Sequence, residues 1–283
     1  MRGGPRLPRG TPSNARYPIP PRLFLAEVWS ILRDKRRSLS QDVASALSIV
    51  RPRPQVCHAH HIPADGPFAV VMNHYCREGL DVWWSAALVT WAIYQQRPGG
   101  EEVRWVMTSE WFFQNPLRRW FQTPLTRWFF NGIANMYGFI TMPPMVAGSG
   151  RVGERAQAVR RTLAEVARRG GVIALAPEGG DVDHMGLTRT PPGVGRFMLL
   201  LCRAGLPLLP AGLAEREGRL EVSFGPPFFL EVEPGLSKEE RDRQASEQVM
   251  VAIGRLLPQE LWGEYAQEIA RAVDDGPCSL SLS

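Results

Sequence analysis

A histidine and two carboxylates follow a short apolar run in VVMNHYCREGLDVWW, residues 70–84. An imidazole can take a proton from a hydroxyl, and a nearby carboxylate can hold the ring in the required tautomer. On a continuous helix, Glu78 and Asp81 would share the face of His74, about 6 and 10 Å away along the axis, but Gly79 interrupts such a helix. The segment therefore predicts either a general base with one of these carboxylates, or a helix cap at Asp81 beside an ordinary loop histidine.

A second polar loop follows another apolar run in LAPEGGDVDHMGLTRTPPGVGRF, which begins at residue 175. Gly179 and Gly180 would let the backbone approach a ligand closely. Arg189 and Arg196 could hold an anionic group. In parallel α/β sheets, ligand sites lie outside the carboxyl ends of the strands. The alternative for the second loop is a solvated acidic loop without a ligand.

Two clusters carry side chains that bind metals in other proteins. They are Asp181, Asp183 and His184 in the second loop, and His58, His60 and His61 in the HAHH run. His58 and His60 would share one face of a strand, but no carboxylate or cysteine completes a ligand set there. We expect no metal; the alternative is a metal-dependent hydrolase that uses the first cluster.

A third feature interleaves aromatic and basic residues in SEWFFQNPLRRWFQTPLTRWFF, residues 109–130. Aromatic rings and arginines together suit a membrane interface, where both find partners. The alternative is that the rings are core residues and the arginines their solvated edges. The residues expected to contact a membrane are Trp111, Phe112, Arg118, Arg119, Trp120 and Phe121.

Short apolar runs that alternate with amphipathic segments must position these loops. The runs PQVCHAHHI, GPFAVVMN, VRWVMT, GVIALAP, LPLLPAGL and RLEVSF predict strands. Helical spacing is predicted near residues 23–36, 39–50, 82–94, 110–132, 154–169, 193–204 and 238–257. This alternation predicts an α/β fold: a mixed, mostly parallel sheet with flanking helices and an N-terminal helical segment.

The 283-residue chain carries 33 basic and 28 acidic residues, for a net charge of +5. This balance permits attraction to phosphates or an anionic membrane, and no nucleic-acid partner is expected. We expect a disordered Pro-rich tail over residues 1–20, one α/β domain over 21–265 and a C-terminal tail over 266–283. The N-terminus lacks the apolar core of a secretory signal. The longest apolar run, Val82–Tyr94, is about two-thirds of the ~20 residues that a spanning helix needs.

Taken in order, four of these segments resemble the glycerolipid acyltransferase family, which includes the 1-acylglycerol-3-phosphate acyltransferases. VVMNH resembles the opening of the family's His-x4-Asp block, and MYGFITM, residues 136–142, resembles its second block, part of the acceptor pocket. LAPEGG and LPLLPAGL are similar to the third and fourth blocks, with Pro207 and Pro210 in place. The similarity covers about residues 54–230 and implies a fold like that of glycerol-3-phosphate acyltransferase.

The resemblance implies that His74 is the general base on an acceptor hydroxyl, which attacks the thioester of acyl-CoA or acyl-carrier protein. A carboxylate would orient the imidazole, and we favour Asp81 over Glu78 because Asp81 directly precedes a helix. The acceptor would be a lysophospholipid or another glycerolipid, bound by Glu178, Gly179, Gly180, Arg189 and Arg196. No cofactor or metal is implied. The four cysteines, Cys57, Cys76, Cys202 and Cys278, show no paired spacing, so we expect free thiols in a reducing compartment. Together with a lipid substrate, they lead us to expect the chain in the cytoplasm, peripheral on the inner face of a membrane.

The sequence departs from the family pattern at three places. Gly79 stands where the family has its Asp, so the loop is two residues longer. Pro144 and Asp181 stand where the family has arginines that read the acceptor's phosphate. The candidates to replace them are Arg77, Arg151, Arg189 and Arg196. These departures also favour the alternative of a catalytically weak or inactive lipid-binding relative.

Overall fold

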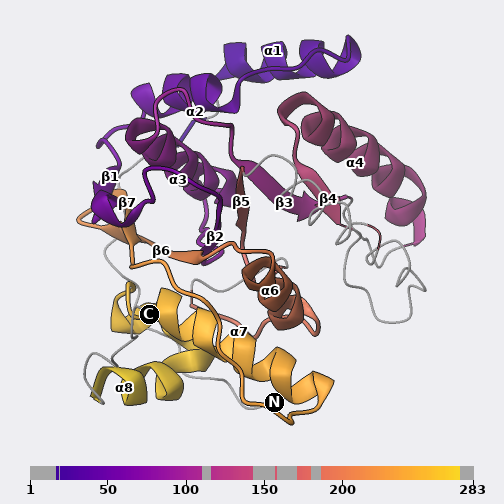
Figure 1. Cartoon of the computed structure of the whole chain (residues 1–283). Helices are drawn as coiled ribbons and strands as arrows, with labels where there is room; N and C mark the ends of the chain where they lie inside the picture. The colour runs from indigo at the N-terminus through magenta and orange to yellow at the C-terminus, as the bar shows by residue number, and fades with distance from the viewer. Residues whose placement is uncertain are drawn as a thin grey trace, which may run out of the picture.

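The computed structural model describes residues 17–18, 20–109, 116–142, 157, 171–179 and 186–274. These residues form a seven-stranded sheet in the order β1-β7-β6-β2-β5-β3-β4 (Figure 1). All neighbouring strands are parallel except β6 and β7, which form an antiparallel pair. The predicted mixed, mostly parallel sheet is therefore confirmed. The strands are β1 (Gln55–Cys57), β2 (Phe68–Met72), β3 (Arg104–Thr108), β4 (Ile140–Met142), β5 (Val172–Leu175), β6 (Leu208–Arg216) and β7 (Arg219–Phe224).

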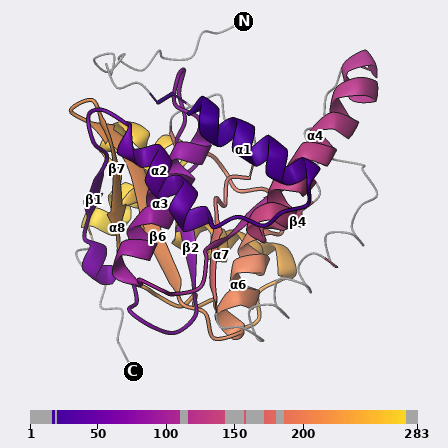
Figure 2. The same ribbon diagram turned by 90° about the horizontal axis from the view of Figure 1, so that it is seen from above.

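Helices cover both faces of the sheet, as Figures 1 and 2 show from two directions. One layer holds α1, α2 and α3, and the other holds α6, α7 and α8. The bounds are α1 (Pro21–Leu32), α2 (Leu39–Ser48), α3 (Val82–Gln96), α4 (Pro116–Tyr137), α6 (Val194–Arg203), α7 (Lys238–Gly254) and α8 (Ala266–Asp274). Pro124 lies within α4, which continues past it.

The central strands explain why the apolar runs are continuous. Every residue of β2 and of β5 is buried. A parallel strand covered by helices on both faces needs apolar side chains on both sides, so its sequence does not alternate. The two strands are neighbours, with Val70 opposite Ala174. The loops that follow them, which carry His74 and Glu178, therefore leave the sheet side by side.

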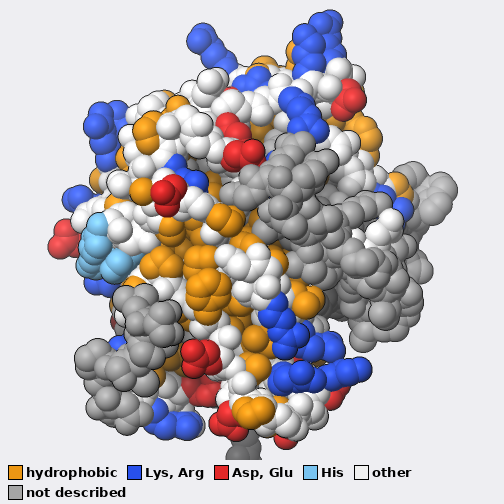
Figure 3. Space-filling model, viewed as in Figure 1, with side chains coloured by type: hydrophobic (Ala, Val, Ile, Leu, Met, Phe, Trp, Pro, Cys, Tyr) orange, Lys and Arg blue, Asp and Glu red, His pale blue; other side chains and the backbone are white. Residues whose placement is uncertain are grey.

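The expectation of a long strand through the histidine run is wrong. β1 ends at Cys57, His58 adopts a left-handed conformation with φ 55°, and Ala59–His61 form a 3-10 turn. His58 and His60 therefore do not share a strand face. Nδ1 of His58 lies 2.9 Å from Oγ of Ser223, and Nδ1 of His61 lies 2.8 Å from the carbonyl oxygen of Phe224, so the turn is fastened to β7. Histidine side chains gather on the surface beside β1 (Figure 3).

Both expected tails need correction. Tyr17, assigned to a disordered tail, is buried against Trp84 at 5.7 Å between ring centroids. Its hydroxyl accepts a hydrogen bond from the backbone N–H of Leu220 at 3.0 Å. Residues assigned to a C-terminal tail form α8, whose Ile269 is fully buried. The predicted helix over 154–169 lies outside the described residues, apart from Gln157, which is helical.

The burial of Ile269 predicts that α8 contributes to the stability of the domain. A Cβ added at Gly254 of α7 would lie 2.2 Å from Cδ1 of Ile269, so the two helices are in close contact there. We expect Ile269→Ala to lower the free energy of unfolding by about 2–4 kcal/mol. The matched control is Val273→Ala on the same helix, whose side chain is 49% exposed. Equal urea midpoints for the two variants would contradict this prediction.

Candidate functional site

Asn73 fastens the end of β2 to the neighbouring strand β6. Its side-chain amide donates to the carbonyl oxygen of Leu213 at 2.9 Å and its Oδ1 accepts from the N–H of Leu213 at 2.7 Å. The side chain is almost fully buried. One amide group thus forms both hydrogen bonds that a further strand residue would have made, which fixes the chain just before His74.

Glu178, which follows β5, holds His74 from the other side. The backbone N–H of His74 donates to Oε1 of Glu178 at 2.6 Å. Oε2 accepts from the N–H of Thr188 at 2.8 Å and from its hydroxyl at 3.1 Å. The residue is 5% exposed, and this burial raises the pKa of Glu178 while the hydrogen bonds from His74 and Thr188 oppose that rise. Both oxygens bind protein groups, so Glu178 positions the histidine loop.

A tight turn absorbs the two extra residues of this loop. Arg77 and Leu80 form an isolated antiparallel bridge, with hydrogen bonds of 3.0 and 2.9 Å in the two directions. Glu78 and Gly79 form the exposed tip, where Gly79 adopts φ 77°, a conformation that glycine tolerates best. The closed turn brings residue 80 back beside residue 77. Asp81 can therefore occupy the position directly before α3 despite the longer spacing from His74.

Arg77 fastens this turn to the end of β6. Its guanidinium forms a two-point ion pair with Glu215, through Nε to Oε2 and through Nη2 to Oε1, the latter at 2.6 Å. Tyr75, also buried, brings its hydroxyl to 3.5 Å from the same carboxylate. The pKa of Arg77 is raised, mainly by its hydrogen bond to Glu215. Arg77 is thus a structural anchor of the loop.

The structure places the two candidate carboxylates differently. Glu78 is exposed at the tip of the turn. Asp81 is the N-cap residue of α3, but its side chain makes no capping hydrogen bond. It too is exposed, whereas His74 is half-buried. The capping interpretation of Asp81 is therefore wrong for its side chain, and its carboxylate is not used to hold the helix.

The predicted acceptor residues separate into two regions. Gly179 is exposed with φ 65°, directly after Glu178. Arg189 turns toward α8, where its Nη2 donates to Glu268 at 2.7 Å and its guanidinium lies 4.4 Å from the ring centroid of Tyr265. Arg196 is exposed on α6. Gly179 therefore lies next to the histidine loop because the preceding Glu178 is bonded to His74, whereas Arg189 is held against α8.

Several predicted residues lie outside the described part of the chain: Trp111, Phe112, Pro144, Arg151, Gly180, Asp181, Asp183 and His184. Arg118, Arg119, Trp120 and Phe121 belong to the first turns of α4. Within the described ranges, no group of three or more His, Cys, Asp or Glu side chains could hold a metal ion. In the same residues, no helix is long and apolar enough to cross a membrane.

The comparison with known families settles the class of protein. A family model described as Acyltransferase matches residues 53–214, more than half of the chain. The chain belongs to this acyltransferase family. Among solved structures, the 1-acyl-sn-glycerophosphate acyltransferase PlsC from Thermotoga maritima is similar, with a TM-score of 0.45 and 16% identity over 83% of this chain and 85% of that one. None of the curated proteins compared with the sequence matches it.

Three anchors of the histidine loop were not predicted from the sequence: the amide of Asn73, the carboxylate of Glu178 and the Arg77–Glu215 pair. Asn73 and Glu178 lie in the segments that resemble the family, so their positions carried a signal but their partners did not. Glu215 lies 138 residues from Arg77, and nothing local marks either as half of a pair.

Because Glu178 accepts hydrogen bonds from both His74 and Thr188, its amide variant should weaken one of these contacts. In Glu178→Gln, one oxygen can still accept, but the NH₂ group must face the other backbone N–H. We expect the free energy of unfolding to fall by about 1–3 kcal/mol. We also expect faster hydrogen exchange at the amides of His74 and Thr188.

The matched control is Thr188→Val, which removes only the hydroxyl donor and leaves the backbone N–H in place. It should cost about 1 kcal/mol and leave the exchange of the His74 amide unchanged. Unchanged exchange at His74 in Glu178→Gln would show that this hydrogen bond does not hold the loop.

Proposed function

We propose that this acyltransferase moves a fatty acyl group from acyl-CoA or acyl-carrier protein to a hydroxyl of a lysophospholipid or glycerolipid-like acceptor. His74 takes the hydroxyl proton as the oxygen attacks the thioester carbonyl. The tetrahedral intermediate then collapses to the ester, and the leaving thiolate receives the proton from the imidazolium. Each turnover thus exchanges a thioester for an ester, and the histidine returns to its neutral form.

The position of His74 carries this proposal. It follows the central strand β2, at the carboxyl edge where parallel sheets bind ligands. Its backbone is held by Glu178 on one side, and the preceding Asn73 is bonded to β6 on the other. A base fixed in this way does not have to be ordered when substrate binds, which favours the productive geometry.

Asp81 is the carboxylate that we propose to orient the imidazole, with Glu78 as the second choice. Asp81 precedes α3 directly and does not spend its oxygens on the helix. Glu78 lies at the tip of the turn that the bridge between Arg77 and Leu80 closes. Both carboxylates are exposed, so the orienting contact would form as substrate closes the site.

We propose that the acceptor's polar head meets Gly179, Gly180 and Arg196. Arg77 and Arg189 were candidates for the missing phosphate-reading arginines, but both form ion pairs within the protein. The acceptor would reach the site from a membrane surface, with the chain peripheral on the inner face. The reaction needs no cofactor beyond the acyl thioester itself.

The alternative is a lipid-binding relative with little transfer activity. The exposure of Asp81 and Glu78 favours it, since neither is held in a position to orient a base. The engagement of Arg77 and Arg189 elsewhere also favours it, because an acceptor phosphate would then meet fewer cations.

Purified chain, an acyl-CoA or acyl-carrier protein and a panel of lysophospholipid acceptors separate these two functions. We expect His74→Ala to lose about 10²–10⁴-fold in transfer rate. Asp81→Asn should lower kcat by about tenfold or more, and Glu78→Gln should leave it nearly unchanged. His60→Ala, which replaces an exposed histidine on the surface turn, is the matched control and should keep full activity.

Transfer that persists in His74→Ala would remove the basis for a histidine base. Absence of transfer with every donor and acceptor, combined with saturable binding of a lysophospholipid, would support the lipid-binding alternative.

A further inference from the structure

Helix α1 has two apolar faces, and the domain covers one of them. Ile31 packs against α4 at Gly132, where an added Cβ would lie 2.5 Å from Ile31 Cγ2. The opposite face carries large apolar side chains that are 55–66% exposed: Leu25, Trp29 and Leu32. Positions 25, 29 and 32 recur at helical spacing and form one stripe. A helix that only covers a core needs one apolar face, so the second face indicates a partner.

Helix α4, which packs against the Ile31 side of α1, also carries exposed apolar side chains. Leu125 is 61% exposed and Trp128 is 48% exposed, and they lie three residues apart on the helix. Trp128 and Ile31 line the same pocket of about 240 Å³ between the two helices, so Trp128 lies beside the last turns of α1. We define the docking face as Leu25, Trp29 and Leu32 of α1.

The charges around α1 determine which partner fits. Arg22, Arg33, Lys35 and Arg36 are all exposed, and Asp34 is the exposed acid among residues 21–36. The guanidinium of Arg33 lies 4.0 Å from the ring centroid of Trp29, a cation–π contact that keeps a positive charge beside the apolar stripe. Lys and Arg side chains project from the upper edge of the molecule, on the side of α1 (Figure 3).

We propose that the docking face binds the surface of an anionic phospholipid bilayer. The apolar stripe would enter the acyl boundary, and the cations would meet the headgroup phosphates. This proposal rests on the proposed function in one respect, because a protein bound to the bilayer would meet its lipid acceptor there. The sequence pattern placed the membrane contact at residues 111–121, and this proposal adds α1.

Flotation with vesicles of equal parts phosphatidylcholine and phosphatidylglycerol tests this surface on the full chain. We expect Leu25→Ser/Trp29→Ser to lose about tenfold or more in bound fraction, because two apolar side chains leave the interface. Wild type should bind pure phosphatidylcholine vesicles more weakly, and added salt should weaken binding to the anionic vesicles. The matched control is Phe229→Ser, which changes an aromatic residue that is 51% exposed away from α1.

Equal flotation of the double variant and wild type would overturn the proposal. A wild-type dimer that the variant loses, without vesicle binding by either, would assign the face to a second copy and would also overturn it. His74→Ala should float like wild type. Failure of acyl transfer with intact flotation would therefore count against the proposed function and not against this surface.

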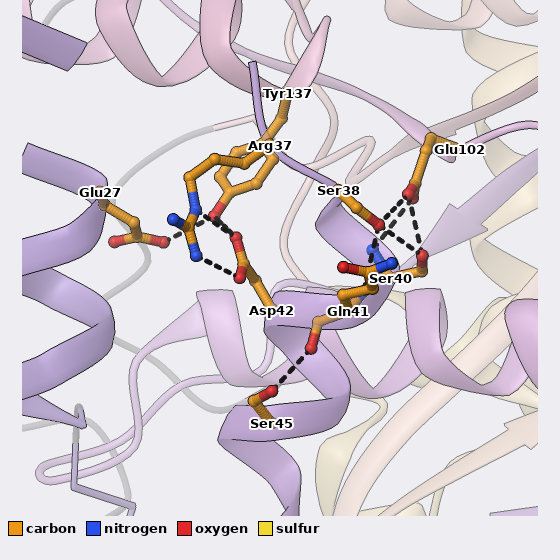
Figure 4. A network of polar contacts seen from close by, with 9 residues as sticks. All are labelled: Glu27, Arg37, Ser38, Ser40, Gln41, Asp42, Ser45, Glu102 and Tyr137. Atoms are coloured by element: carbon orange, nitrogen blue, oxygen red, sulfur yellow. Dashed lines mark hydrogen bonds and ion pairs between the residues drawn. The ribbon is translucent and has the colours of Figure 1, made fainter. Parts of the chain in front are cut away.

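On the inner face of α1, the Glu27 side chain contacts Tyr137 of α4 (Figure 4). The Tyr137 hydroxyl lies 2.9 Å from Glu27 Oε1 and 2.8 Å from Asp42 Oδ2. Arg37 donates to both oxygens of Asp42 at 2.7 and 2.6 Å, which favours the ionised form of that carboxylate. One hydroxyl has one proton. If that proton lies on the contact with Asp42, the contact with Glu27 needs a proton from Glu27.

We infer that Glu27 is held as a neutral carboxylic acid that donates to Tyr137 and fastens α1 to α4. The groups that face it are Tyr137 from α4, Asp42 from α2 and Arg37 from the segment between α1 and α2. Burial is the main reason that the pKa of Glu27 is raised. The hydrogen bond with Tyr137 and the charge of Arg37 oppose this rise, and the charge of Asp42 adds to it. A neutral Glu27 also leaves α1 without an inward negative charge close to an anionic bilayer.

Urea unfolding as a function of pH tests this state. Because the pKa of Glu27 is higher in the folded chain, the folded state holds more protons, and the free energy of unfolding falls as pH rises through that window. Glu27→Gln keeps a donor for Tyr137 and cannot ionise. The urea midpoint of this variant relative to wild type should therefore rise as the pH increases above the ordinary pKa range of glutamate.

Glu260→Gln, at an exposed carboxylate, is the control and should show no such trend. An independent measurement is the infrared band of a protonated carboxyl, which should be present in wild type at neutral pH and reduced in Glu27→Gln. A midpoint difference that does not change with pH, or an unchanged band, would overturn the inference.

Discussion

The hydrogen bonds that hold the carboxyl end of β2 fix the rest of the site. β2 lies between β6 and β5, and both neighbours reach past its end to bind the following residues. Leu213 exchanges two hydrogen bonds with Asn73, and Glu178 accepts from the backbone of His74. The carboxylate of Glu178 is nearly as buried as the core, so removing either contact would leave a polar group without solvent. The histidine loop therefore has one position relative to the sheet.

With these anchors in place, the two-residue expansion of the loop has a simple outcome. The chain makes a hydrogen-bonded turn between Arg77 and Leu80, and the extra residues leave the site toward solvent. Leu80 returns to the core and is fully buried. The ion pair of Arg77 with Glu215 holds this turn to β6. A longer spacing between His74 and Asp81 thus does not displace the helix that follows.

The fold determines whether an arginine is available to a ligand, as Arg77 and Arg189 show. Arg77 and Arg189 are suitable phosphate ligands by residue type, yet one is bound to Glu215 and the other to Glu268. Helix α1 shows the converse: its acid, Glu27, faces the protein, and its cations face solvent beside exposed apolar rings. The surface around α1 is therefore positively charged because its cations face solvent and its acid faces the protein, and not because of the net charge of the whole chain.

The sequence by itself indicated most of the strands and helices, because buried parallel strands need continuous apolar runs and amphipathic helices need helical spacing. It did not mark β4, which is three residues long. It also determined the family, through blocks whose order is visible along the chain. Local pattern failed at His58, where a left-handed residue ends the strand, and at α8, whose burial of Ile269 depends on distant partners.

Only the tertiary structure decided which groups meet. Glu178 is separated from His74 by 104 residues, and Leu213 from Asn73 by 140. Spacing along a chain gives no information about such pairs, since the order of strands in the sheet brings them together. The sequence therefore identified the histidine, and the packing of β6, β2 and β5 decided what holds it.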